Sequence, residues 1–175
     1  MKRMTILLLA ALLLFAIGCG APTGQADDPN AVFIDPNAVR GGEYGDLYFE
    51  SNGARFGIYD ETEAVLKALP AYRSTFTGQS CAFDTEDVVY FFTGFQITTN
   101  VIDGVSRVTA IKIEDDTVKT PQGLYIGMPE QDAAAAFPAL SEADWNLEDG
   151  SALLSVTITD GAVYGITYTP VITEG

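Results

Sequence analysis

Histidine is missing from the whole of this 175-residue sequence. It is the commonest general base near neutral pH and the usual zinc ligand in proteins. Its absence excludes catalysis of the Ser-His-Asp and Cys-His types, and the sequence contains no other nucleophile motif. We therefore predict a protein that is not an enzyme and that binds no cofactor and no metal ion.

Basic residues are also scarce, with nine against 24 acidic ones and a formal net charge of -15 at pH 7. Two of the nine, Lys2 and Arg3, lie in the N-terminal leader; without them seven basic residues face 24 acidic ones, a balance of -17. A field of this sign repels nucleic acid and anionic lipid headgroups. The sequence therefore predicts no nucleic-acid partner and no basic membrane-binding patch.

Only two cysteines are present, and Cys19 belongs to the leader junction, which leaves Cys81 alone in the rest of the chain. A disulfide framework within the domain is therefore impossible. We interpret Cys81 as a buried small hydrophobe in a strand from Ser80 to Phe83, because few cations and no histidine are available to activate its thiol.

The one long apolar run, from Ile6 to Ile17, follows a basic start and ends in small residues before Cys19. It is shorter than the roughly 20 residues of a membrane-spanning helix. The arrangement resembles bacterial lipoprotein signals, which implies a signal peptide over 1–18 and a diacylglyceryl anchor, with palmitate-type chains, on Cys19. We expect a lipoprotein on the extracytoplasmic face of the cell membrane; an uncleaved N-terminal anchor is the alternative.

Residues 19–42 are rich in Gly, Ala, Pro, Asp and Asn, and Asp28-Pro29-Asn30 recurs as Asp35-Pro36-Asn37. Such a composition is typical of a flexible linker. Ordinary turn chemistry explains the repeat, although a calcium or partner site is the alternative. We place a single domain over 43–170 and a tail over 171–175.

Alternating apolar residues and four Asn-Gly or Asp-Gly turns, at residues 52, 103, 149 and 160, predict antiparallel hairpins. A polar loop is expected around Thr75 to Gly78. The expected strands are Gly45 to Glu50, Ala54 to Ile58, Ser80 to Phe83, Val88 to Phe92, Phe95 to Thr99, Val105 to Ile113, Ala152 to Thr159 and Ala162 to Thr169.

Two helices are expected between the strands. One runs near Glu61 to Leu69 with Asp60 as its cap, and the other runs near Pro129 to Phe137 and ends at Pro138. A short strand precedes each helix, which indicates two copies of one unit, about 45–116 and 117–169. We predict an α+β fold with both helices on one face of an antiparallel sheet, and with Leu66 and Phe137 buried.

This plan, with Gly127-Met128 opening the second helix, resembles the superfamily of the β-lactamase-inhibitor proteins and the SmpA/OmlA envelope proteins. The phrase from Thr120 to Gly127, with Ser80 to Phe83 and Val89-Tyr90 upstream, also resembles lipoproteins of anaerobic Firmicutes. Members of the superfamily are inhibitors or assembly scaffolds. The resemblance therefore implies binding through the sheet surface rather than catalysis.

Four tyrosines in or beside expected strands, Tyr48, Tyr90, Tyr125 and Tyr164, are candidates for a binding surface, because tyrosine offers a large rigid contact area with a polar tip. The alternative is that they fill strand positions by propensity alone.

Two acidic groups, Asp84, Glu86 and Asp87 in one turn and residues 114–116 in another, could act as acid and base or bind calcium, or could simply be solvated turns. The sequence thus favours a non-enzymatic protein- or peptide-binding module of the cell envelope. The alternatives are an envelope hydrolase that uses the acidic turns and a calcium-stabilised ligand-capture lipoprotein.

Overall fold

The computed structural model describes residues 45–171. The expected signal peptide, the linker with Cys19, and the last four residues of the tail lie outside the described residues. None of the helices between residues 45 and 171 has the length and apolar character that a membrane crossing requires.

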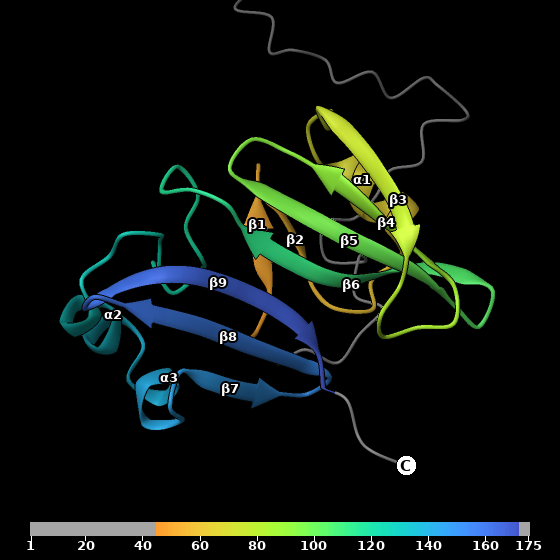
Figure 1. Cartoon of the computed structure of the whole chain (residues 1–175). Coiled ribbons are helices and arrows are strands. Elements are labelled where there is room, and N and C mark those ends of the chain that lie inside the picture. The colour runs from red at the N-terminus through yellow and green to blue at the C-terminus, as the bar shows by residue number, and fades with distance from the viewer. Residues whose placement is uncertain (1–44, 172–175) are drawn as a thin grey trace, which may run out of the picture. The chain divides into compact units, whose positions relative to one another are not determined.

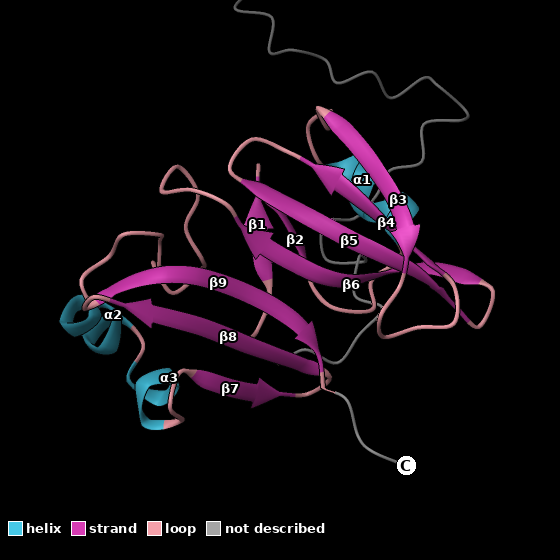
Figure 2. Cartoon of the chain, in the orientation of Figure 1, coloured by secondary structure: helices cyan, strands magenta, loops and turns pink. Residues whose placement is uncertain are grey.

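Seven strands form one antiparallel sheet in the order β3-β4-β5-β6-β9-β8-β7, and β1 and β2 form a separate hairpin (Figure 1). Strands predominate over three short helices (Figure 2), so the described residues have an α+β structure. The elements are β1 (Phe49–Ser51), β2 (Ala54–Phe56), α1 (Thr62–Ala68), β3 (Ser74–Gln79), β4 (Glu86–Phe91), β5 (Phe95–Ile102), β6 (Val105–Ile113), α2 (Glu130–Ala136), α3 (Pro138–Glu142), β7 (Asn146–Asp149), β8 (Ala152–Thr159) and β9 (Ala162–Pro170).

One face of the sheet carries the hydrophobic core. Residues paired directly across strands point to the same face, and one apolar row of such pairs crosses six strands. The row consists of Tyr90, Ile97, Ile111, Tyr168, Leu154 and Leu147. The neighbouring row on the opposite face is mostly polar: Ser74, Phe91, Gln96, Lys112, Thr167, Ser155 and Asn146. We call this opposite face the open face.

The β1-β2 hairpin and the helices complete the core. Phe49 of β1 is fully buried, and its ring centroid lies 5.0 Å from that of Phe95 and 6.4 Å from that of Tyr168. Val65 of α1 and Ala133 of α2 belong to the same core, as does Leu140 of α3. The open face is turned toward the viewer in Figure 1, where α1 lies behind β3 and β4.

Three of the expected hairpin turns, Asn52-Gly53, Asp103-Gly104 and Asp160-Gly161, are confirmed. All six residues have φ between 51° and 78°, as a type I′ turn requires. The fourth turn differs, because Asp149 pairs with Ala152 and leaves residues 150 and 151 as the loop.

Two segments before helices make the same backbone contacts with the second strand of a hairpin. Before α1, the N–H of Tyr59 donates to the carbonyl of Val108 at 2.8 Å. The N–H of Val108 donates to the carbonyl of Asp60, the next residue, at 2.9 Å. Before α2, the N–H of Gly127 donates to the carbonyl of Val163 at 2.7 Å, and the N–H of Val163 donates to the carbonyl of Met128 at 2.9 Å. Tyr59 and Gly127 also share a left-handed backbone, with φ of 70° and 89°.

The bounds of α1 and α2 agree with the predictions to within one residue, but the cap of α1 differs. Asp60 does not cap α1; its buried carboxylate accepts the N–H of Gly57 at 2.9 Å, and the residue at the N-cap is Glu61. Helix α2 ends at Ala136, before Pro138, as predicted, and Pro138 then begins the separate helix α3, because its fixed φ suits a first helical position. Leu66 and Phe137 are only partly buried, at the margin of the core.

Strand β3 occupies the predicted polar loop around Thr75 to Gly78. All six residues of β3 pair with β4, yet five of them are exposed, and only Gly78 is partly covered. Because this edge strand is exposed to solvent on both faces, it is held by backbone hydrogen bonds rather than by burial of its side chains. An apolar alternation is therefore absent from its sequence.

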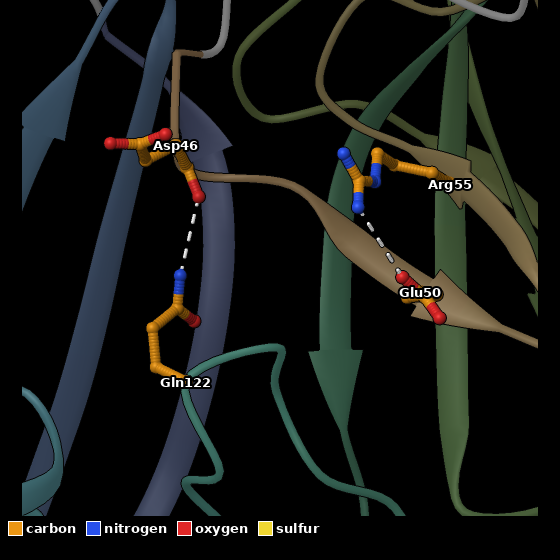
Figure 3. A network of polar contacts seen from close by, with 4 residues as sticks. All are labelled: Asp46, Glu50, Arg55 and Gln122. Atoms are coloured by element: carbon orange, nitrogen blue, oxygen red, sulfur yellow. Dashed lines mark hydrogen bonds and ion pairs between the residues drawn. The ribbon is translucent and has the colours of Figure 1, made fainter. Parts of the chain in front are cut away.

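Asp46, near the start of the described residues, is held by two segments that are distant in the sequence. Gln122 Nε2 donates to the carbonyl of Asp46 at 3.2 Å, and the Asp149 carboxylate accepts the N–H of Asp46 at 2.6 Å. Figure 3 shows Gln122 reaching Asp46, and beside it the 3.8 Å ion pair between Arg55 and Glu50 across the hairpin. The start of the domain is thus attached beside the β7-β8 turn.

Tyr168 combines full burial with a hydroxyl that has no hydrogen-bond partner among the described residues. Burial raises the pKa of Tyr168, and the Thr120 hydroxyl, which lies nearby without the geometry of a regular hydrogen bond, offsets this only in part. Removal of an unsatisfied buried group is favourable, so Tyr168→Phe should raise the free energy of unfolding by about 1 kcal/mol at pH 7. Urea unfolding measures this change.

The same substitution should alter how the free energy of unfolding depends on pH in alkaline solution. The unfolded chain releases the tyrosine proton near pH 10, whereas the folded chain still retains it there. The contribution of this group to the free energy of unfolding is therefore complete below about pH 10, and it is lost as the pH rises through the raised pKa. Wild type should therefore lose stability more steeply than Tyr168→Phe between about pH 10 and 11. Equal slopes would contradict the assignment.

Candidate functional site

The four candidate tyrosines lie in different settings. Tyr90 is on the core face, paired with Ile97, and burial is the main cause that raises its pKa. Tyr48 is partly buried with the Arg55 guanidinium 4.0 Å from its ring centroid. The Tyr125 ring lies 4.7 Å from Lys119 Nζ, and Tyr164 is 72% exposed. The structure does not bring the four together as one open surface.

Tyr164 owes its exposure to a β-bulge. In the β8-β9 ladder Thr157 pairs with Gly165 and Ile158 pairs with Val163, which leaves Tyr164 as the extra residue. An unpaired bulge residue departs from the regular alternation of faces. The period-two pattern of the sequence therefore could not fix the direction of this ring.

Cys81 is exposed and not buried as predicted, because residues 80–85 form a loop instead of a strand. The Ser80 hydroxyl accepts the N–H groups of Ala82 and Phe83 at 3.2 and 3.1 Å. This local turn competes with strand pairing, as serine commonly does. It carries the Cys81 side chain away from the core.

The two acidic turns lie mostly in solvent. Asp84 and Glu86 are exposed, and hydrogen bonds from the hydroxyl and N–H of Thr117 lower the pKa of Asp115. No group of three potential metal ligands comes together between residues 45 and 171. In the first turn, Asp87 is oriented by a partner, since Asn100 Nδ2 donates to its Oδ1 at 2.9 Å.

A concavity arises where the sheet divides. Only residues 111–113 of β6 pair with β9, opposite residues 166–168. Beyond that point β6 turns instead to the segment before α1, through the Val108 contacts with Tyr59 described above, while β9 stays with β8 as far as Pro170. A groove of about 530 Å³ lies at this division. Its volume is within the range of roughly 300–1,000 Å³ that is usual for ligand sites.

The groove is lined by several separate elements. One side comes from β5 and β6, another from the ends of β7, β8 and β9, and the third from the loop before β4 and β4 itself. Half of the lining residues are apolar, four carry hydroxyls and two are acidic, with no basic residue among them. The lining residues are Ser80, Ala82, Phe83, Asp87, Thr98, Thr109, Ala110, Glu148, Leu153, Thr169, Pro170 and Val171.

An open-face row leads from the sheet edge into this groove. Phe76 of β3 pairs with Val89, which pairs with Thr98, which in turn pairs with Ala110. Phe76 is 62% exposed, and a Cβ on Gly78 would lie 2.9 Å from its ring, so the ring covers that glycine. Apolar surface therefore continues from the groove toward the edge of the sheet.

Sequence reasoning missed most of the groove. Thr98, Ala110, Leu153 and Glu148 come from four strands, and only the tertiary pairing places them together. Asp87 was included among the acidic turn residues, although nothing local distinguished it from Asp84. A bulge at Thr109 also breaks the expected alternation along β6, because Thr98 pairs with Ala110 and Thr99 with Val108.

Comparison of the chain with protein-family models, curated proteins and solved structures found no match.

Proposed function

We propose that this chain is a lipid-anchored, non-enzymatic module of the cell envelope that binds a protein or peptide segment in the open-face groove. The observation that carries the proposal is the groove itself, which is half apolar and continues along an apolar row toward the β3 edge. Apolar concavities with a few polar groups are the usual form of binding sites.

The composition of the groove supports binding without chemistry. Its polar groups are hydroxyls and two carboxylates, with no thiol, amine or imidazole among its lining residues. An envelope hydrolase built on the acidic turn residues is the alternative; Asp87 of that turn lines the groove, whereas Asp84 and Glu86 lie outside it. A calcium-stabilised capture protein is the other alternative: no three potential metal ligands come together between residues 45 and 171, and the repeated Asp-Pro-Asn of the linker lies outside the described residues.

The leader supports the proposed location. The apolar run and the small-residue junction before Cys19 are what an anchor on the extracytoplasmic face of the cell membrane requires. The acidic linker then spaces the binding domain from the bilayer. In this proposal the lipid holds the protein at the membrane and the groove faces other envelope components.

The proposal includes the two-copy origin of the domain, of the kind found in the β-lactamase-inhibitor and SmpA/OmlA superfamily. It is supported by the matched contacts of Tyr59 with Val108 and of Gly127 with Val163. The order β4-β5-β6-β9-β8-β7 is also symmetric about the junction of β6 and β9. Two copies joined there by their last strands place the groove at their boundary.

The test uses the full mature chain in detergent, with the acyl group on Cys19 checked by intact mass, and a panel of capped synthetic tetrapeptides of graded apolar content. Thr98→Trp fills the groove from β5, whereas Gln96→Trp places the same ring two residues away on the same strand and face, outside the lining. Thr98→Trp should weaken the best peptide at least about tenfold, a loss of about 1.4 kcal/mol. Gln96→Trp should leave its affinity unchanged.

Equal affinities of wild type and Thr98→Trp would exclude the groove as the binding site. Cleavage of a peptide or glycan that is abolished by Asp84→Asn or Glu86→Gln would replace the binding proposal with the hydrolase alternative. Fluorescence anisotropy reports the affinities, and mass spectrometry of the ligand reports cleavage.

A further inference from the structure

Resting on that proposed function, we propose that the ligand of the groove is a short extended peptide segment in which apolar side chains are flanked by lysine or arginine. The inference joins two features of the site. One is the limited length of the open-face row from Phe76 to Ala110. The other is the presence of carboxylates on two sides of the groove, without any basic residue in its lining.

The apolar row sets the length and form of the segment. From Phe76 on β3 to Ala110 on β6 it crosses three gaps between strands. Strands lie about 4.8 Å apart, so the row measures about 14 Å, which an extended chain of about four residues covers at roughly 3.3 Å each. Val89 and the Thr98 methyl group lie between the two ends of the row. A compact small molecule would leave much of this row uncovered.

The carboxylates lie on different elements around the groove. Asp87 is on β4, two residues from Val89 and on the same face, while Glu148 is on β7 beyond Leu153, with which it pairs. Asp87 is held in one direction by Asn100, which is 2% exposed and also donates to the carbonyl of Glu86 at 3.2 Å. A carboxylate oriented beforehand loses less freedom when a cation binds.

The wider field acts in the same direction. Residues 45–171 contain six basic and nineteen acidic residues. Such an excess attracts a cationic segment and raises its association rate, whereas an acidic segment is repelled. A ligand that buries apolar side chains and places positive charge beside Asp87 and Glu148 therefore complements both the apolar surface and the negative charge of the groove.

The test compares two capped tetrapeptides on the full mature chain, lysine-leucine-phenylalanine-lysine and its analogue with glutamine in place of both lysines. At low salt the lysine peptide should bind about tenfold tighter, at roughly threefold for each partly exposed ion pair. This advantage should vanish in the double variant Asp87→Asn/Glu148→Gln. It should also vanish near 1 M salt, where the screening length is about 3 Å.

The matched control is Asp84→Asn/Glu86→Gln, which removes the same total charge from outside the groove lining and should keep most of the advantage. An equal loss in this control would show general charge attraction and overturn the inference. Equal binding of the two peptides, with both blocked by Thr98→Trp, would also overturn it while the proposed function stands. Failure of both peptides to bind would remove the inference, and the wider peptide panel would then decide the proposed function separately.

Discussion

Replacing Phe49 with alanine should lower the free energy of unfolding by about 3–5 kcal/mol, the usual cost of deleting a fully buried aromatic side chain. Phe49 is 0% exposed, and its ring contacts those of Phe56, Phe95 and Tyr168, with centroids between 5.0 and 6.4 Å away. It thus joins the β1-β2 hairpin to β5 and β9. The cavity would lie between the β1-β2 hairpin and the seven-stranded sheet. Urea unfolding followed by circular dichroism measures the change.

Phe76→Ala is the matched control, because the same side chain is removed from a 62% exposed position on the open face. We expect a cost below about 1 kcal/mol there, as is usual for surface positions. A small cost for both variants would show that the hairpin is not part of the cooperative core.

Gly94→Ala should also be severe. Gly94 has φ of +80°, and an added Cβ would lie 2.5 Å from Val118 Cγ2 and 2.6 Å from Thr117 Oγ1. The left-handed backbone costs about 1–2 kcal/mol for alanine, and the overlap with well-packed neighbours adds roughly 1–3 kcal/mol. A total loss of about 2–5 kcal/mol is expected, measurable as a fall in the urea midpoint.

Gly53→Ala separates the two contributions. Gly53 has nearly the same φ, +77°, but an added Cβ would meet nothing within 4 Å. This variant should therefore lose only the backbone part, about 1–2 kcal/mol. If Gly94→Ala costs no more than Gly53→Ala, the loop at residues 115–118 yields to the added methyl group and does not hold the β4-β5 turn rigidly.

Much of the antiparallel sheet could be predicted from the local sequence pattern. Strands β6 and β8 have the expected bounds, and the turns at Asn52, Asp103 and Asp160 adopt the expected geometry, because an Asx-Gly pair and the adjacent alternation act within a few residues. The helices lie within one residue of the expected bounds at each end. The cap of α1 was misjudged, since Asp60 accepts the N–H of Gly57 instead.

The sequence by itself determined the antiparallel α+β class and three of the four expected hairpin turns. Strand β3, the division between β6 and β9, and the groove at that division were decided only by the tertiary structure. Backbone pairing across the sheet holds β3 without a hydrophobic pattern of its own. The groove brings Ala110, Glu148 and Asp87 together from distant strands, and no local signal records which strand ends diverge.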